Sequence, residues 1–131
     1  MSETIRVEVA AAPSAFTPVR LVLGGLGTRL EFSVDQLDDL YLAAEHLFLA
    51  VLRFEDSTRF GVELRLDDGN LRVSSGPFTS SALREQVEPA AADGACLDLC
   101  RLLHTTCDEV YVTESDGGYQ VILIKSRKGA A

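Results

Sequence analysis

The fold is decided by one stretch of the sequence, FSVDQLDDLYLAAEHLFLAV, which covers residues 32–51. Ser33 is a favourable helix N-cap residue, and Gln36 three positions later completes a capping box. Aspartates in the first turns add negative charge where the helix dipole favours it. Apolar residues then recur at spacings of three and four. The stretch predicts an amphipathic helix from Val34 to about Arg53 with one buried face.

Strand patterns lie on both sides of this helix. Apolar and polar residues alternate over residues 5–9 and again over residues 60–66, as in strands with one buried face. An Asp-Gly turn at residues 68–69 joins the second pattern to a third strand. Two more strands are predicted on either side of a glycine-rich turn at residues 115–118. The sequence therefore predicts two hairpins and a separate first strand.

Two more helices and two irregular segments complete the order of elements. Thr17 and Pro18 favour a helix start, and a further helix is expected over residues 95–105. Residues 74–94 lack a sustained period and are expected to form a lid or connector, and residues 126–131 a disordered tail. The order predicts an α+β fold, a two-layer α/β sandwich with helices on one face of a mostly antiparallel sheet.

Composition limits the class of protein. The chain has 131 residues and a formal net charge of -8, from 20 acidic and 12 basic side chains. This length predicts a single domain over residues 1–131. The negative charge disfavours direct contact with nucleic acid or an anionic membrane. No segment has the roughly 18 apolar residues of a membrane span, and three closely spaced cysteines favour reduced thiols. A cytoplasmic location is expected.

A glycine-rich string, LGGLGTRL at residues 23–30, suggests one kind of enzyme. It resembles the phosphate-binding loop of sugar-phosphate nucleotidyltransferases, whose glycines let backbone N–H groups approach phosphates. That family places a proline and a lysine after the loop and has a much longer chain. Here Glu31 and Phe32 follow, and then a capped helix. The sequence therefore disfavours a nucleotidyltransferase.

A second resemblance covers nearly the whole chain. The matching segments are VRL at 19–21, AAEHLFLAV at 43–51, LCRLL at 99–103 and GG at 117–118 before the last strand. In these segments the chain resembles bacterial anti-sigma-factor serine kinases, which belong to the histidine-kinase-like (Bergerat, or GHKL) ATPase superfamily. The order of elements derived above is also the order in that family. The resemblance implies the same sandwich fold.

The resemblance implies a nucleotide site that has lost its metal ligand. The family has Glu-x-x-x-Asn on its second helix, with the Glu as general base and the Asn as a Mg²⁺ ligand. Glu45 matches the Glu as a vestigial base, but Leu49 replaces the Asn. Leucine offers no oxygen to magnesium.

The glycine boxes of the family are also reduced. Its adenine box, Asp-x-Gly-x-Gly, falls on VSSGPF, which keeps only Gly76 and has no aspartate. Its phosphate box keeps Gly94 and places Asp98 where phosphates would lie. The resemblance therefore implies a pseudokinase without a catalytic residue and without ATP or Mg²⁺ as cofactor. The alternative is an active ATP-dependent serine/threonine kinase that acts on an anti-anti-sigma protein.

Arg20 is the candidate partner-binding residue. In the family, an arginine of the first helix contacts the sigma factor and the competing anti-anti-sigma protein, and Arg20 falls at that position. An alternative is that Arg20 pairs with a nearby acidic side chain. The acidic chain suits a basic, DNA-binding partner. The resemblance implies an anti-sigma-factor-like regulator that sequesters a sigma factor, and a homodimer remains open because relatives often dimerise.

The cysteines allow one more hypothesis. Cys96, Cys100, His104 and Cys107 are spaced so that they would share one side of a helix. Thiolates and an imidazole can hold zinc or an iron–sulfur cluster. A straight helix spreads four such ligands over about 16 Å, too far to surround one ion. No metal is therefore expected, and a redox- or metal-responsive regulator is kept as an alternative.

Overall fold

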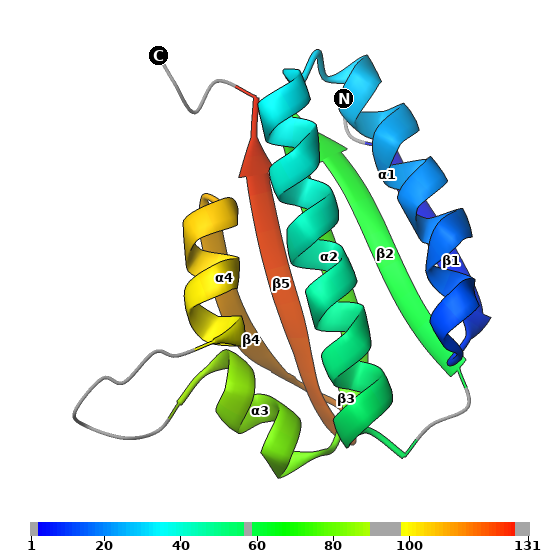
Figure 1. The fold of residues 1–131 in the computed structure, drawn as a ribbon, viewed down its shortest axis with the longest axis vertical. Coiled ribbons are helices and arrows are strands. Elements are labelled where there is room, and N and C mark those ends of the chain that lie inside the picture. The colour runs from blue at the N-terminus through cyan, green and yellow to red at the C-terminus, as the bar shows by residue number, and fades with distance from the viewer. Residues whose placement is uncertain (1–2, 57–58, 90–97, 128–131) are drawn as a thin grey trace.

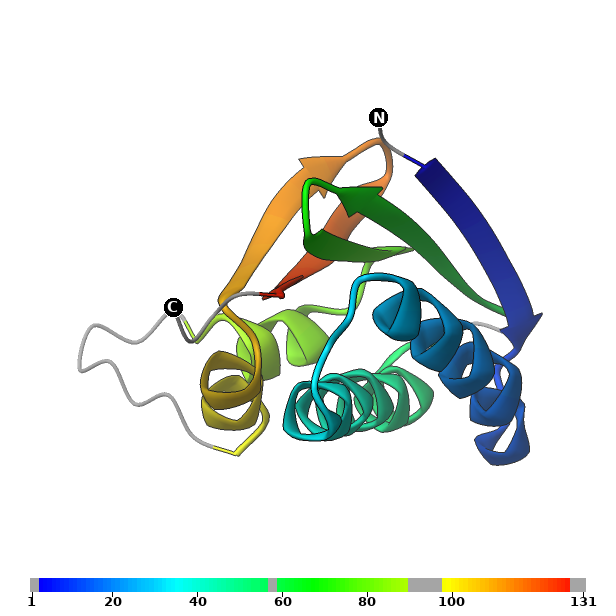
Figure 2. The same ribbon diagram turned by 90° about the horizontal axis from the view of Figure 1, so that it is seen from above.

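The computed structural model describes residues 3–56, 59–89 and 98–127, which form a sheet and a layer of helices (Figures 1 and 2). The strands are β1 (Glu3–Ala10), β2 (Arg59–Asp67), β3 (Asn70–Phe78), β4 (Glu109–Ser115) and β5 (Gly118–Ser126). The helices are η1 (Pro13–Ala15), α1 (Phe16–Arg29), α2 (Val34–Phe54), α3 (Ser81–Val87) and α4 (Leu99–Thr106). The strands pair antiparallel in the order β1-β2-β3-β5-β4. The helices cover one face of the sheet, so the predicted α+β sandwich is confirmed.

Helix α2 lies in the middle of the helical layer (Figure 1) and begins as the sequence predicts. The Ser33 hydroxyl accepts a hydrogen bond from the Gln36 N–H at 3.1 Å, and the Gln36 side chain accepts one from the Ser33 N–H at 2.8 Å. The Gln36 amide also donates to the carbonyl oxygens of Ser126 and Arg127. The capping box therefore also joins the start of α2 to the end of β5.

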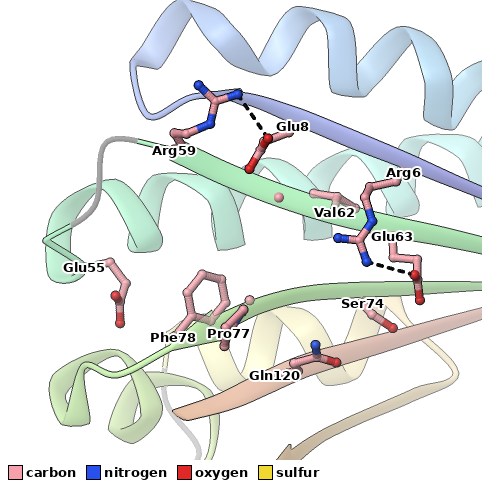
Figure 3. A pocket seen from close by; sticks show the side chains of 12 residues that line it. Arg6, Glu8, Glu55, Arg59, Val62, Glu63, Ser74, Pro77, Phe78 and Gln120 are labelled. Atoms are coloured by element: carbon pink, nitrogen blue, oxygen red, sulfur yellow. Dashed lines mark hydrogen bonds and ion pairs between the residues drawn. The ribbon is translucent and has the colours of Figure 1, made fainter. Parts of the chain in front are cut away.

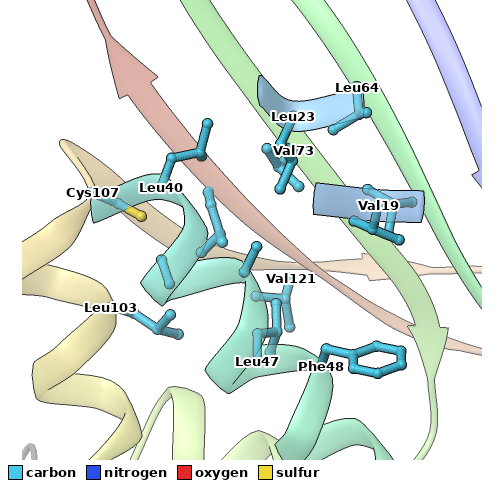
Figure 4. Close-up of a cluster of buried hydrophobic side chains, with 14 of the residues drawn as sticks. Val19, Leu23, Leu40, Leu47, Phe48, Leu64, Val73, Leu103, Cys107 and Val121 are labelled. Atoms are coloured by element: carbon cyan, nitrogen blue, oxygen red, sulfur yellow. The ribbon is translucent and has the colours of Figure 1, made fainter. Parts of the chain in front are cut away.

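One face of α2 packs into the core between the helices and the sheet (Figure 4). Leu40, Leu47 and Phe48 are almost completely buried there. The Phe48 ring lies 5.5 Å from the ring of Phe16 on α1 and 4.9 Å from the ring of Phe60 on β2, between ring centres. Such aromatic pairs add to the free energy gained by burying the rings. The core therefore joins α1, α2 and the sheet.

Helix α1 starts earlier than its sequence suggests. It begins at Phe16, directly after η1, and no side chain caps it. The helix start that Thr17 and Pro18 favour therefore lies too late in the sequence, since Ala15 is the N-cap residue. Phe16 is buried against Phe48, so packing in the core sets this helix start.

The glycines of α1 serve helix packing. A side chain at Gly24 would collide with the Tyr41 hydroxyl, and one at Gly27 would collide with Leu37. Tyr41 and Leu37 both belong to α2. The glycines therefore let the two helices approach each other closely, which offsets their low helix propensity.

The segment expected as a connector is largely regular where it is described. Strand β3 continues to Phe78, and α3 forms over Ser81–Val87, where the sequence shows a short helical pattern. Residues 90–97, which include part of the predicted connector and the first residues of the predicted last helix, lie outside the described residues. The connector within the described chain is thus shorter than predicted.

The last strand extends into the predicted tail, since β5 includes Ser126. The Lys125 ammonium is buried, donates to the carbonyl oxygen of Thr106 at 2.7 Å and pairs with Asp39 at 3.5 Å. These contacts fix the end of β5 against α2 and α4. Among the described helices, none is long and apolar enough to cross a membrane.

Candidate functional site

A groove between α2, α3 and the start of α4 contains two of the residues expected at the nucleotide site. Leu49 and Asp98 both line this cavity of about 600 Å³. The remaining lining residues are His46, Ala50, Arg53, Phe54, Gln86, Leu99 and Leu102. The family resemblance placed Leu49 and Asp98 at the same site only by analogy. In the structure both residues line the same cavity. We call this cavity the α2–α4 groove.

The chemistry of the α2–α4 groove differs from that of a phosphate site. Leu49 is 46% exposed and presents a hydrocarbon side chain at the position where the family has its metal ligand. Asp98 is the N-cap residue of α4, with no hydrogen bond from its side chain to the helix. A carboxylate at a helix N-terminus occupies the place that the helix dipole would otherwise offer to a phosphate. Among the described residues, no group of three or more His, Cys, Asp or Glu side chains could hold a metal ion.

The basic side chains of the groove were missed by the sequence analysis. His46 and Arg53 lie on α2, and the Arg53 guanidinium stacks on the Phe54 ring at 5.3 Å from the ring centre. Their spacing from Leu49 could have indicated this, since three or four residues separate neighbours on one side of a helix. Glu45 lies one turn before Leu49 and is half-buried, but it does not line the groove.

Gly76 lies away from the α2–α4 groove. It lines a separate cavity of about 390 Å³ on the other face of the sheet, where Arg6 pairs with Glu63 at 3.3 Å and Arg59 pairs with Glu8 at 3.1 Å (Figure 3). At Gly76 φ is 126°, and an added Cβ would lie 2.8 Å from the carbonyl oxygen of Tyr119. The close approach of β3 to β5 therefore accounts for this glycine. Gly94 lies outside the described residues.

Arg20 lies on the exposed side of α1 and stacks on an aromatic ring of α2. Its guanidinium carbon is 4.3 Å from the centre of the Tyr41 ring, which the close approach at Gly24 makes reachable. No ion pair between the described residues includes Arg20. The next residue, Leu21, is 71% exposed. Arg20 is therefore exposed, and its observed partner is the ring of Tyr41 and not an acidic side chain. We call Arg20, Leu21 and Tyr41 the α1 surface.

The cysteines do not lie on one continuous helix, as the sequence analysis assumed. Helix α4 ends at Thr106, so Cys107 is its C-cap residue and not part of a continued helix. Burial raises the pKa of the Cys107 thiol to about 11. Cys100 is disulfide-bonded, so the expectation of reduced thiols is wrong for this residue. His104 is exposed on α4, and Cys96 lies outside the described residues.

The order and pairing of the elements define an α+β sandwich with helices on one face of a five-stranded antiparallel sheet. This fold is similar to that in the crystal structure of the RsbU and RsbW domains of Rv1364c from Mycobacterium tuberculosis, with a TM-score of 0.67 and 15% sequence identity. The similarity covers 95% of this chain and 32% of that chain. No protein-family model and no curated protein sequence matches the chain. The likeness concerns the fold alone, which is similar to an RsbW-type fold.

Proposed function

We propose that this chain is a regulator of sigma-factor partner switching that binds a sigma factor without using ATP. The fold similarity and the sequence resemblance both support this proposal. The fold is similar to an RsbW-type domain, and RsbW-like proteins are the anti-sigma factors that the sequence resembles. The chemistry of the α2–α4 groove then bears on whether this chain uses ATP, and the α1 surface bears on whether it binds a protein partner.

The observation that carries the proposal is the lining of the α2–α4 groove. Magnesium needs oxygen ligands, and Leu49 offers none. A phosphate near the start of α4 would lie beside the negative charge of Asp98. Phosphoryl transfer depends on positioning both the metal and the phosphates. We therefore infer that the groove does not support kinase activity.

The α1 surface supports protein binding. Arg20 is exposed and stacked on Tyr41, so its guanidinium is held in place while its donors remain accessible to a partner. Exposed Leu21 beside it adds an apolar contact. Arginine and tyrosine are enriched among the residues that dominate interfaces. A net charge of -8 over the chain favours a partner with basic regions, such as a DNA-binding sigma factor.

The proposal is tested by capturing sigma factors with the purified chain and measuring the affinity of the captured protein by calorimetry. The charge reversal Arg20→Glu is expected to weaken binding at least tenfold, about 1.4 kcal/mol. The matched control is Arg101→Glu, which reverses an exposed charge on α4. It is expected to change the affinity less than twofold. Equal effects of the two variants, or capture of no sigma factor, would contradict the proposed interface.

A separate titration with ATP and Mg²⁺ tests the groove. No saturable binding is expected at millimolar nucleotide, because Leu49 offers magnesium no oxygen and Asp98 places a negative charge beside the start of α4. Saturable binding that depends on magnesium would overturn the ATP-independent part of the proposal and favour the kinase. It would leave the sigma-factor result unaffected, so the two parts fail separately.

A further inference from the structure

The two edges of the sheet differ in how they are protected. Strand β1 carries three charged residues, Glu3, Arg6 and Glu8, which pair with Arg29, Glu63 and Arg59 respectively. Charges of this kind are the usual means of preventing a further strand from adding to a sheet edge. Strand β4 pairs only with β5, in an unbroken register from Glu109 to Ser115. The sheet therefore has two different edge strands, the charged strand β1 and the strand β4, whose middle residues are uncharged.

The middle of β4 lacks the features that protect an edge. Its residues Val110–Thr113 include no charge and no proline, and no bulge interrupts the pairing with β5. Among the described residues, no backbone hydrogen bond joins β4 to a loop or helix on its other side. Within the described residues, the backbone N–H and C=O groups on that side have no backbone partner, as at a sheet edge that can pair with another extended chain.

An apolar groove runs beside this edge, with a volume of about 310 Å³. Val110 and Val112 of β4 form one wall and remain half-buried. The other lining residues are Val87, Glu88, Pro89, Cys100, His104 and Tyr111. Side chains alternate across a strand, so every second residue of a chain paired with β4 would point into this groove. We call this edge and cavity the β4 groove.

The charges around the β4 groove are mostly negative. Glu88 lines it, and exposed Glu109 and Glu114 stand at the two ends of β4. Arg84 pairs with Glu114 at 2.8 Å and with Glu88 at 3.5 Å, whereas no ion pair between the described residues includes Glu109. His104 is the basic group of the lining, and exposed Asp108 precedes the strand. A docking chain is therefore favoured if it carries positive charge.

We propose that the β4 groove binds an extended peptide segment of a partner protein in which apolar and basic residues alternate. The segment adds to the sheet as a further strand beside β4, with its apolar side chains against Val110 and Val112. Strand β4 and α4, which contribute residues to the β4 groove, lie on the other side of α2 from α1 (Figure 1). The β4 groove is thus a second contact, and it stands whether or not the α1 surface binds a sigma factor.

The test uses a fluorescent, acetylated and amidated nine-residue peptide of alternating lysine and valine, titrated with the full chain. Saturable binding is expected, measured by fluorescence anisotropy. Hydrogen exchange of the β4 amides is expected to slow on binding. A second peptide of the same sequence is N-methylated at alternate residues on the edge that would pair. It keeps the charge and loses those N–H donors, so it is expected to bind at least tenfold more weakly.

Two protein variants locate the site. Val112→Lys places a positive charge in the groove and is expected to weaken peptide binding at least tenfold. Thr4→Lys places the same charge on the exposed face of the opposite edge strand and is expected to change affinity less than twofold. The N-methylated peptide is compared on the unaltered chain, so that result does not depend on whether a variant folds.

Equal affinity of the methylated and unmethylated peptides would show simple charge attraction and overturn the proposal. Slowed exchange in α1 without any change in β4 would overturn it as well. If the chain instead self-associates in sedimentation experiments, and Val112→Lys abolishes this, the edge serves a second copy of the chain and the peptide proposal is wrong.

Discussion

Two neighbouring residues of α2 show how differently the two sides of one helix are constrained. Phe48 is completely buried between α1 and the sheet, whereas Leu49 is 46% exposed in the α2–α4 groove. The buried side decides whether the chain folds, because its residues fill the core. The groove side contributes little to that packing. A sandwich of this type can therefore keep its fold while the chemistry of its groove changes.

The largest expected loss of stability comes from removing the ring of Phe48, on the buried side of α2. We expect Phe48→Ala to lower the free energy of unfolding by about 3–5 kcal/mol, because it leaves a cavity next to Phe16 and Phe60. Urea denaturation followed by circular dichroism measures the change. The matched control Leu49→Ala is expected to cost less than about 1 kcal/mol. Similar losses for both variants would show that the two sides of α2 do not differ in this way.

A smaller effect is expected from alkaline pH, through a thiol that packs with the buried side of α2 (Figure 4). Burial raises the pKa of Cys107 from 9.0 to about 11, so the native state keeps this proton to higher pH than the unfolded state does. The stability contributed by the neutral thiol is complete below pH 9 and is lost as the pH rises towards 11. We expect a loss of about 2 kcal/mol between pH 8 and pH 10.5.

The pH effect is measured by urea denaturation at both pH values. Cys107→Ala removes the titrating group and should reduce the loss. Some loss will remain, because burial and the nearby charge of Glu55 also raise the pKa of Tyr119 to about 12. An identical pH dependence in Cys107→Ala would exclude Cys107 as a cause.

The start of α2 provides a third test, at the end of the helix away from the groove. We expect Ser33→Ala to destabilise the chain by about 1 kcal/mol, because the Gln36 N–H loses its acceptor. The melting temperature checks this. Ser33→Asp keeps an acceptor oxygen and should retain most of the stability. If both variants melt alike, the cap does not stabilise the helix through this hydrogen bond.

These differences also explain how much could be predicted from the sequence. The start of α2 is encoded locally, since Ser33 and Gln36 contact each other across one turn, and the prediction is confirmed. The start of α1 is decided by the contact of Phe16 with a residue of another helix, so local capping rules placed it wrongly. Hydrophobic alternation likewise identified the strands, but it did not show that β3 continues to Phe78.

The candidate site was less predictable than the fold for the same reason. Leu49 and Asp98 come from distant parts of the chain, and only the family resemblance connected them before the structure placed both in one groove. The partner of Arg20 was sought among nearby acids, yet its guanidinium stacks on the ring of Tyr41, whose hydroxyl occupies the space that Gly24 leaves free. The spacing of residues within one helix or strand does not determine which residues of another element they contact, so sequence patterns could not reveal these contacts.

The smallest expected effect comes from replacing Leu49 by asparagine, the residue found at this position in the family that the sequence resembles. Leu49→Asn changes a partly exposed side chain without altering the core, so the free energy of unfolding should change by less than about 0.5 kcal/mol. We also expect this variant to show no saturable binding of ATP with Mg²⁺, because Asp98 still places a negative charge at the start of α4. Calorimetry of Leu49→Asn and of the double variant Leu49→Asn with Asp98→Gly separates the two causes. Binding by the single variant would mean that one oxygen ligand was all that the groove lacked.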